Sequence, residues 1–217
     1  VREPGDYQWI TASQNKRAVS VKNVVPPVSV SGPWEVHFAP DWGAPPVVTF
    51  ERLISWSDHS DPGVKYYSGT ATYTKTLRVP GEMQATGNHL YLDLGDVQAI
   101  ARVTLNGQDL GTIWHPPFRV DVTNIAKADD NTLEVQVVNL WPNRLIGDEQ
   151  LPEDSERNPN GTLKAWPQWL LDGQPSPTGR LTFTSWRLWK KDDALLPSGL
   201  LGPVTLQVTH SIAIDEP

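Results

Sequence analysis

The 217-residue sequence contains no cysteine, and this absence removes several classes of protein. Without cysteine there is no disulfide scaffold, no zinc-thiolate site and no cysteine nucleophile, although the cellular compartment stays undecided. The five histidines are scattered and lack the close spacing of a zinc pair. The motifs G-x-S-x-G, G-x-G-x-x-G, G-x-x-x-x-G-K-[ST] and H-E-x-x-H are also missing. Nucleophilic and zinc-dependent hydrolysis therefore have no recognisable motif here.

Other absences concern partners. No apolar run approaches the roughly 18 residues that cross a bilayer, so we expect no membrane partner. The formal net charge is -7 and no run of Lys or Arg is present, so the chain would repel a nucleic acid. The sequence begins at Val1 without a basic and apolar leader, and we expect a piece of a longer protein rather than a mature secreted product.

Proline and tryptophan are unusually frequent, with 20 prolines and 10 tryptophans against one methionine and four phenylalanines. Tryptophan is rarely buried completely, and a surplus often leaves some indoles part-exposed as flat contact surfaces. Packing explains most of them, but some are candidates for a binding surface.

Alternation of apolar and polar residues dominates the chain and predicts an all-β protein. Eight or more short strands, separated by Gly, Pro, Asn and Asp clusters, indicate a β-sandwich of the jelly-roll type. The alternating segments include residues 34–38, 70–79, 90–94, 99–105, 118–122, 133–137, 181–189 and 204–208. No uniformly apolar strand face is left over for an obligate dimer, so we expect a monomer.

One corner of the predicted sandwich is unusual. Asn106-Gly107 favours a type I′ hairpin turn, and the strand that follows breaks at Trp114-His115-Pro116-Pro117 before alternation resumes. A Pro-Pro step cannot donate to a ladder, so Trp114 and His115 are expected off the sheet edge, where they could stack on a sugar. Alternatively, Trp114 and Phe118 cap the end of the sandwich or pack on a partner domain.

Two regions do not fit the sandwich, which we place at residues 31–212. Residues 1–30 look like an N-terminal extension or an inter-domain junction. Residues 139–179 form a long irregular region rich in Trp, Pro and acidic residues, with one short helix expected at 165–171. Structureless loops longer than about 12–15 residues are usually functional or disordered, and the tryptophans favour function.

The carboxylates of this region carry the catalytic alternative. Glycoside hydrolysis requires two acids about 5–9.5 Å apart, and Asp148, Glu149 and Glu153 could supply them. A solvated acidic loop, or oxygen ligands for one structural Ca²⁺, would explain the same residues. We expect this chain to need no cofactor and not to be an enzyme by itself.

Several segments together resemble the galactose-binding-like jelly roll of family 2 type glycoside hydrolases. The similarity extends to the C-terminal region of family 106 α-L-rhamnosidases and then covers about residues 30–210. The matching segments are Gly32-Pro33-Trp34-Glu35-Val36, Asp41-Trp42-Gly43, Ser68-Gly69-Thr70-Ala71-Thr72-Tyr73, Leu92-Asp93-Leu94-Gly95-Asp96-Val97, Ala101 to Gly107, Leu110-Gly111, Pro117-Phe118, Asp121-Val122-Thr123, Asn131 to Val135, Asn143 to Asp148 and Leu196 to Val204.

The resemblance implies a noncatalytic accessory module, because a separate barrel carries the catalytic acids in such enzymes. Its expected partners are an oligosaccharide or polysaccharide of the plant cell-wall type, such as rhamnose-containing pectin, and a catalytic domain of the same parent chain. A bacterial enzyme of this kind would act outside the cell or in the periplasm. A purely structural brace for the catalytic domain is the remaining alternative.

The predicted carbohydrate-binding residues combine tryptophans with polar partners. Trp186 is the best candidate, because it shares a predicted strand face with threonines and is therefore expected to be exposed. The full set is Trp114, His115, Arg144, Asp148, Trp166, Trp169, Trp186, Arg187 and Trp189.

Overall fold

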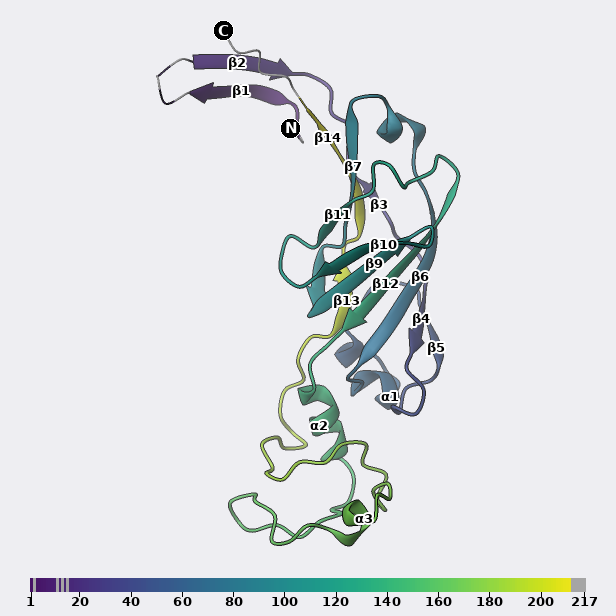
Figure 1. Cartoon of the computed structure of the whole chain (residues 1–217), viewed down its shortest axis with the longest axis vertical. Coiled ribbons are helices and arrows are strands. Elements are labelled where there is room, and N and C mark those ends of the chain that lie inside the picture. Colours follow the sequence, from purple (N-terminus) through teal and green to yellow (C-terminus); the bar gives the residue numbers. More distant parts are fainter. Residues whose placement is uncertain (2, 11, 13, 15, 212–217) are drawn as a thin grey trace.

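The computed structural model describes residues 1, 3–10, 12, 14 and 16–211. Figure 1 shows an elongated molecule with three parts: a two-stranded hairpin at one end, a β-sandwich in the middle, and a lobe at the other end. The lobe consists of residues 139–198, between the last long strand of the sandwich and its return. The all-β sandwich predicted from the sequence is confirmed.

The larger sheet of the sandwich has six antiparallel strands. Two nine-residue strands at its centre pair along their whole length. Alternate side chains point into the core, where Tyr73, Val103 and Val135 are fully buried. In sheet order the strands are β10 (Gln108–Ile113), β9 (Ile100–Leu105), β12 (Asp130–Val138), β6 (Thr70–Arg78), β4 (Trp34–Phe38) and β5 (Val47–Phe50).

The second sheet has four antiparallel strands and closes the core from the other side. Leu90, Leu92 and Leu206 are buried from this sheet. Its strands are β11 (Arg119–Asp121), β7 (Asn88–Asp93), β14 (Thr205–His210) and β3 (Val28–Ser29). Two further short strands pair with each other, β8 (Asp96–Gln98) and β13 (Gly199–Gly202). Because β3 pairs with β14, the sandwich starts a few residues before the expected boundary at residue 31.

The region expected to be an extension contains a hairpin that the sequence reading missed. Its strands are β1 (Gly5–Ile10) and β2 (Lys16–Val21), and they pair only with each other within the described part of the chain. Figure 1 shows this hairpin projecting away from the sandwich. A two-stranded hairpin without further strands is marginally stable in water, so we expect β1 and β2 to be less stable than the sandwich.

The helical elements are all short. They are η1 (Trp56–Asp58), α1 (Pro62–Lys65), η2 (Gly81–Gln84), α2 (Pro142–Asp148) and α3 (Gln168–Leu171). Among the described residues, none of these helices has the length and apolarity to cross a bilayer. The helix expected at residues 165–171 begins three residues later, because Pro167 has an extended backbone and stands at the N-cap of α3.

The predicted strand over residues 181–189 is wrong. This segment lies in the lobe, and its regular pairing is limited to an isolated bridge between Trp186 and Thr162. Its backbone amides are used elsewhere: those of Leu181 and Thr182 donate to a carboxylate, and that of Arg187 donates to the carbonyl of Gly161. The alternating segment 181–189 therefore has no neighbouring strand with which to form a ladder.

The hairpin turn between β9 and β10 is confirmed. Asn106 and Gly107 have φ values of 54° and 80°, and Leu105 pairs with Gln108. The Asn106 side chain also anchors the turn, because its Nδ2 donates to Asn131 Oδ1 at 2.8 Å. The chain also leaves the sheet after β10, as predicted: Trp114 and His115 lie outside any strand. Phe118, which follows them, is buried in the core.

Tyr73 connects three elements of the core. Its hydroxyl accepts hydrogen bonds from Trp56 Nε1 at 2.6 Å and from the backbone amide of Leu200 at 3.1 Å. Burial raises the pKa of this hydroxyl, so it stays neutral. Gly199 makes the approach possible, because a Cβ there would lie 2.5 Å from Trp56 Nε1. The contact joins η1, β6 and β13.

We expect Gly107→Val to lower the free energy of unfolding by about 1–2 kcal/mol, because a β-branched residue is strained at positive φ. A Cβ at this position would meet no atom within 4 Å, so the strain would be confined to the backbone. Chemical denaturation measures the change. Gly107→Asn is the matched control, since asparagine tolerates this conformation. Equal stability of Gly107→Val and the parent chain would contradict the turn assignment.

Tyr73→Phe is expected to lower the free energy of unfolding by about 2–4 kcal/mol, because two buried donors lose their acceptor. Thermal and denaturant unfolding would both report it. The control is Tyr7→Phe, whose hydroxyl donates to the exposed carbonyl of Glu3 at 2.7 Å and should matter by less than about 0.5 kcal/mol. Similar effects of the two changes would argue against a special role for Tyr73.

Candidate functional site

The lobe leaves and rejoins the sandwich at two points that buried amide side chains hold together. Asn139 Nδ2 donates to the carbonyl of Tyr67 at 2.8 Å and to Ser198 Oγ at 3.2 Å. Asn143 makes a two-way contact with Leu196, donating from Nδ2 at 2.8 Å and accepting at Oδ1 at 2.8 Å. These bonds place α2 firmly beneath the sandwich (Figure 1).

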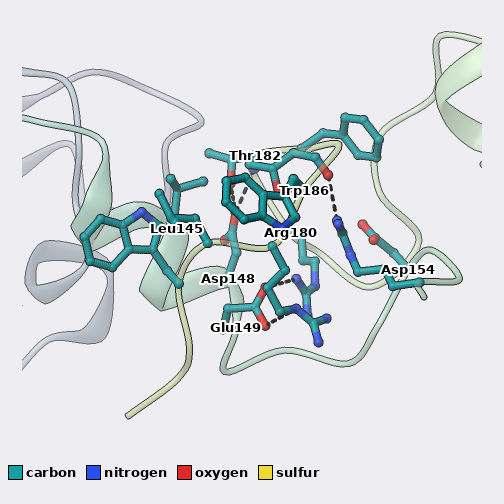
Figure 2. A pocket seen from close by; sticks show the side chains of 13 residues that line it. Leu145, Asp148, Glu149, Asp154, Arg180, Thr182 and Trp186 are labelled. Atoms are coloured by element: carbon teal, nitrogen blue, oxygen red, sulfur yellow. Dashed lines mark hydrogen bonds and ion pairs between the residues drawn. The ribbon is translucent and has the colours of Figure 1, made fainter. Parts of the chain in front are cut away.

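Asp148, near the end of α2, ties this helix to the returning chain. Its Oδ2 accepts from the backbone amides of Leu181 at 3.1 Å and Thr182 at 2.7 Å, and from the Thr182 hydroxyl at 2.6 Å. Its Oδ1 lies 3.0 Å from Nη2 of Arg144, and both side chains are almost fully buried. Figure 2 shows Asp148 and Thr182 facing each other across this junction. Arg144 and Asp148 therefore brace the lobe from inside.

A cavity of about 200 Å³ lies beside α2, between this helix and the returning segment (Figure 2). Its aromatic walls include Phe183, Trp186 and Trp189. Its charged lining consists of three arginines and three acidic residues: Arg157, Arg180, Arg187, Asp148, Glu149 and Asp154. Flat apolar surfaces and polar groups of both signs thus converge on one small space.

Two arginines and two glutamates at the cavity compensate each other. Arg180 is buried and places Nη1 2.9 Å from Oε1 of Glu149, while Arg187 Nε lies 3.1 Å from Oε2 of the same carboxylate. Arg187 also pairs with Glu153, which lies 4.0 Å from Arg180 Nη2. Asp148, Glu149 and Glu153, the three carboxylates of the hydrolase alternative, therefore all form ion pairs with arginines.

Arg157 differs from the other two arginines of the cavity. It donates from Nη1 to the carbonyl of Gly161 at 3.1 Å and from Nη2 to the carbonyl of Thr184 at 2.7 Å. Within the described residues it forms no ion pair with a carboxylate, whereas Arg180 and Arg187 do. Its buried Nε, like that of Arg187, has no hydrogen-bond partner. Burial, and then the nearby charge of Arg187, lowers the pKa of the Arg157 guanidinium.

Four of the predicted tryptophans gather in the lobe. Trp166 and Trp186 are 58% and 56% exposed, while Trp169 and Trp189 are half-buried. The rings of Trp166 and Trp169 contact Phe183, with centroids 5.7 and 5.8 Å apart. Because Phe183 also lines the cavity with Trp186 and Trp189, one aromatic cluster spans the cavity and the outer surface.

Trp114 and His115 are not part of this cluster. They belong to the β10–β11 connection of the sandwich, which Figure 1 shows apart from the lobe. Trp114 is 69% exposed, and its ring contacts His115 with centroids 4.8 Å apart. Of the nine predicted residues, the structure brings Asp148, Trp186, Arg187 and Trp189 to the cavity. Trp166 and Trp169 contact Phe183 of its lining, and Arg144 pairs with Asp148.

The sequence reading missed Arg157, Arg180 and Phe183. These residues lie in irregular chain, where no periodicity predicts the direction of a side chain. The acidic cluster at residues 148–156 was the available signal, because carboxylates gathered in a semi-buried loop need cationic partners.

The structural Ca²⁺ stays a prediction. In the described ranges, no group of three or more His, Asp or Glu side chains comes together in a way that would hold a metal ion. Three acidic residues of the lobe have other partners: Asp148 and Glu149 pair with arginines, and Asp154 accepts from the Ser176 hydroxyl.

Comparison with known proteins identifies the family. Residues 57–174 match the family described as glycosyl hydrolase 2 galactose-binding domain-like, and the chain belongs to this family. A protein of Formosa agariphila, provisionally named a beta-glucuronidase, is 47% identical over 218 residues. The alignment covers 96% of this chain but 19% of that protein, so the chain spans about a fifth of this relative.

Solved structures agree with this assignment. A rhamnosidase from Novosphingobium sp. PP1Y superposes with a TM-score of 0.68 and 37% identity, over 86% of this chain and 15% of that one. A beta-glucuronidase from Faecalibacterium prausnitzii shares the fold, with a TM-score of 0.55 and 20% identity over 85% of this chain and 31% of its own. The resemblance derived from the sequence is confirmed.

Asp148→Ala is expected to lower the free energy of unfolding by about 3–5 kcal/mol, because it leaves the buried Arg144 charge uncompensated. Denaturant unfolding followed by tryptophan fluorescence measures the change. The control is Glu156→Ala in the same lobe, whose side chain is 82% exposed and pairs with Lys164 at 3.4 Å. That pair should contribute less than about 1 kcal/mol. An Asp148→Ala chain as stable as the control would show that the junction does not depend on this carboxylate.

Proposed function

We propose that this chain is a noncatalytic accessory module of a larger polysaccharide-degrading glycoside hydrolase, and that its lobe binds carbohydrate. The observation that carries this proposal is the aromatic cluster of the lobe, in which Trp166 and Trp186 are each more than half exposed beside a polar cavity. An indole offers a flat apolar face to a pyranose ring at a low cost in conformational entropy. Charged side chains at the cavity would orient the hydroxyl groups.

The parent chain would supply the catalytic domain. The Formosa agariphila protein and the Novosphingobium rhamnosidase are several times longer than this chain, and both have glycosidase names. We propose a plant-type cell-wall glycan, such as rhamnose-containing pectin, as the target, with this module acting as a monomeric unit of the enzyme.

Trp186→Ala and Trp166→Ala are the direct tests. Each should fold normally and weaken glycan binding by about 1–3 kcal/mol, by analogy with aromatic stacking on other ring ligands. Titration calorimetry with rhamnose-bearing pectin, galactan, xylan and glucan oligosaccharides measures the affinity of the parent chain and both variants.

Trp114→Ala is the matched control, because Trp114 is also an indole that is more than half exposed, but it lies on the sandwich. It should leave lobe binding unchanged. Loss of binding in Trp114→Ala alone would place the platform on the sandwich, and the absence of heat with every glycan would refute the binding proposal.

A structural brace is the second candidate, and a specific observation favours it. Leu140, Trp141 and Leu196, where the lobe joins the sandwich, are 59%, 53% and 38% exposed, as expected for a surface that another domain covers. The calorimetry separates the two functions, since a brace alone binds no glycan.

The hydrolase alternative has its own assay, because only that function would release reducing sugar from a glycan mixed with the isolated chain.

A further inference from the structure

Most of the charged side chains around the lobe cavity are paired, but one arginine and one aspartate are not. Arg180 and Arg187 share Glu149 and Glu153, and Asp148 is paired with Arg144. These pairs account for every charged side chain of the cavity lining except Arg157 and Asp154.

Arg157 and Asp154 each have neutral partners in the described structure. The carboxylate of Asp154 accepts hydrogen bonds from Ser155 Oγ at 3.1 Å and from Ser176 Oγ at 2.7 Å. The guanidinium of Arg157 donates to two backbone carbonyls. The cavity therefore contains a guanidinium held in place by carbonyl oxygens, without a direct counter-ion.

The surroundings of Arg157 favour an incoming anion. Burial and the charge of Arg187 lower the pKa of this guanidinium although Glu153 and Glu149 attract it, so an oxyanion in direct contact would stabilise its charged form. Guanidinium groups bind carboxylates and sulfates through parallel hydrogen bonds, which gives the contact direction as well as strength. The buried Nε of Arg157 has no partner at present.

The same cavity also has the features of a sugar site. Trp186 lines it and is more than half exposed, so the indole reaches both the cavity and the solvent. The cavity volume of about 200 Å³ is smaller than the roughly 300–1,000 Å³ of sites for drug-sized ligands, and this size suits one ring or one substituent of a longer chain.

From these observations we propose that the lobe cavity binds an anionic group carried by a sugar ring, with Arg157 receiving the oxyanion and Trp186 stacking on the ring. The inference rests on the proposed carbohydrate-binding function and specifies its ligand class. Two sources share this chemistry, a uronic acid carboxylate and a sulfate ester. Figure 2 shows the cavity that would receive the group.

A comparison made on the ligand side tests the proposal without altering the protein. Calorimetry with the intact chain would compare galacturonate and glucuronate oligosaccharides with their carboxyl-reduced counterparts, which have the same rings and linkages but no charge. O-sulfated forms of the reduced oligosaccharides give the second arm. We expect an anionic form to bind at least about tenfold more tightly than the neutral form, because a hydrogen bond between two charged groups is stronger than one to a neutral group. Added salt should reduce this difference.

A variant pair assigns the preference to Arg157. Arg157→Met should remove the preference for the anionic ligand while leaving the neutral counterpart within about twofold. Arg102→Met is the matched control, because Arg102 is an exposed arginine of the sandwich that pairs with Asp109 at 2.8 Å. If Arg157→Met fails to fold because two carbonyls lose their donor, Arg157→Lys replaces it. Lysine retains the charge but loses the two-pronged geometry, so the preference should fall by about tenfold.

The outcomes separate this inference from the proposed function. Equal or tighter binding of neutral oligosaccharides would overturn the anionic site and leave the carbohydrate-binding proposal standing. No binding of any charged or neutral glycan would overturn both. A preference for the anion that survives in a folded Arg157 variant would place the anion at another residue and would also refute the proposal. Preference for the sulfated over the carboxylated form, or the reverse, identifies the source of the oxyanion.

Discussion

The position of the lobe depends on a buried polar junction with the sandwich. Ser198 is its centre: its backbone amide donates to Ser55 Oγ at 2.9 Å, and its hydroxyl accepts from Asn139 and Asn143. Buried polar groups without partners are costly, so this set of bonds favours one geometry strongly over its alternatives. Because Asn143 belongs to α2, the helix starts in a fixed orientation, and the cavity beside it inherits that orientation.

Beyond the junction, the lobe is held in a different way from the sandwich. The sandwich has continuous ladders and a shared apolar core, whereas the lobe has two short helices and isolated bridges. Its segments are joined by Asp148, by the arginine and glutamate pairs, and by the contacts of Phe183 with two tryptophans. The groups that shape the cavity thus also hold the lobe together. For this reason a change in the ligand tests recognition more cleanly than a change in an arginine.

The sandwich could be predicted from the sequence because its strands satisfy local and long-range requirements together. In β6 and β12 the apolar positions alternate, and each strand has neighbours on both sides. Asn106-Gly107 was readable for a similar reason, since two adjacent residues determine the turn. Residues 181–189 alternate as well, but their amides bind Asp148 and Gly161 instead of a strand. A sequence pattern records which face a residue would take in a strand, and it does not show whether a partner strand exists.

The candidate site was predicted only in part, for a related reason. Trp186 was expected to be exposed on the argument that it lies in a strand, and it is exposed although no strand forms there. Its exposure follows from the bond between its Nε1 and the carbonyl of Asn160, at 3.0 Å, which holds the indole at the surface. Arg157 could not be found in the same way, because what distinguishes it is that, among the described residues, it forms no ion pair with any of the carboxylates around the cavity. That property depends on where Glu149 and Glu153 direct their charges, and it becomes visible only when the whole ion-pair network is in place. Specificity for a charged sugar in this lobe would therefore arise from how the arginines are partnered and not from their number.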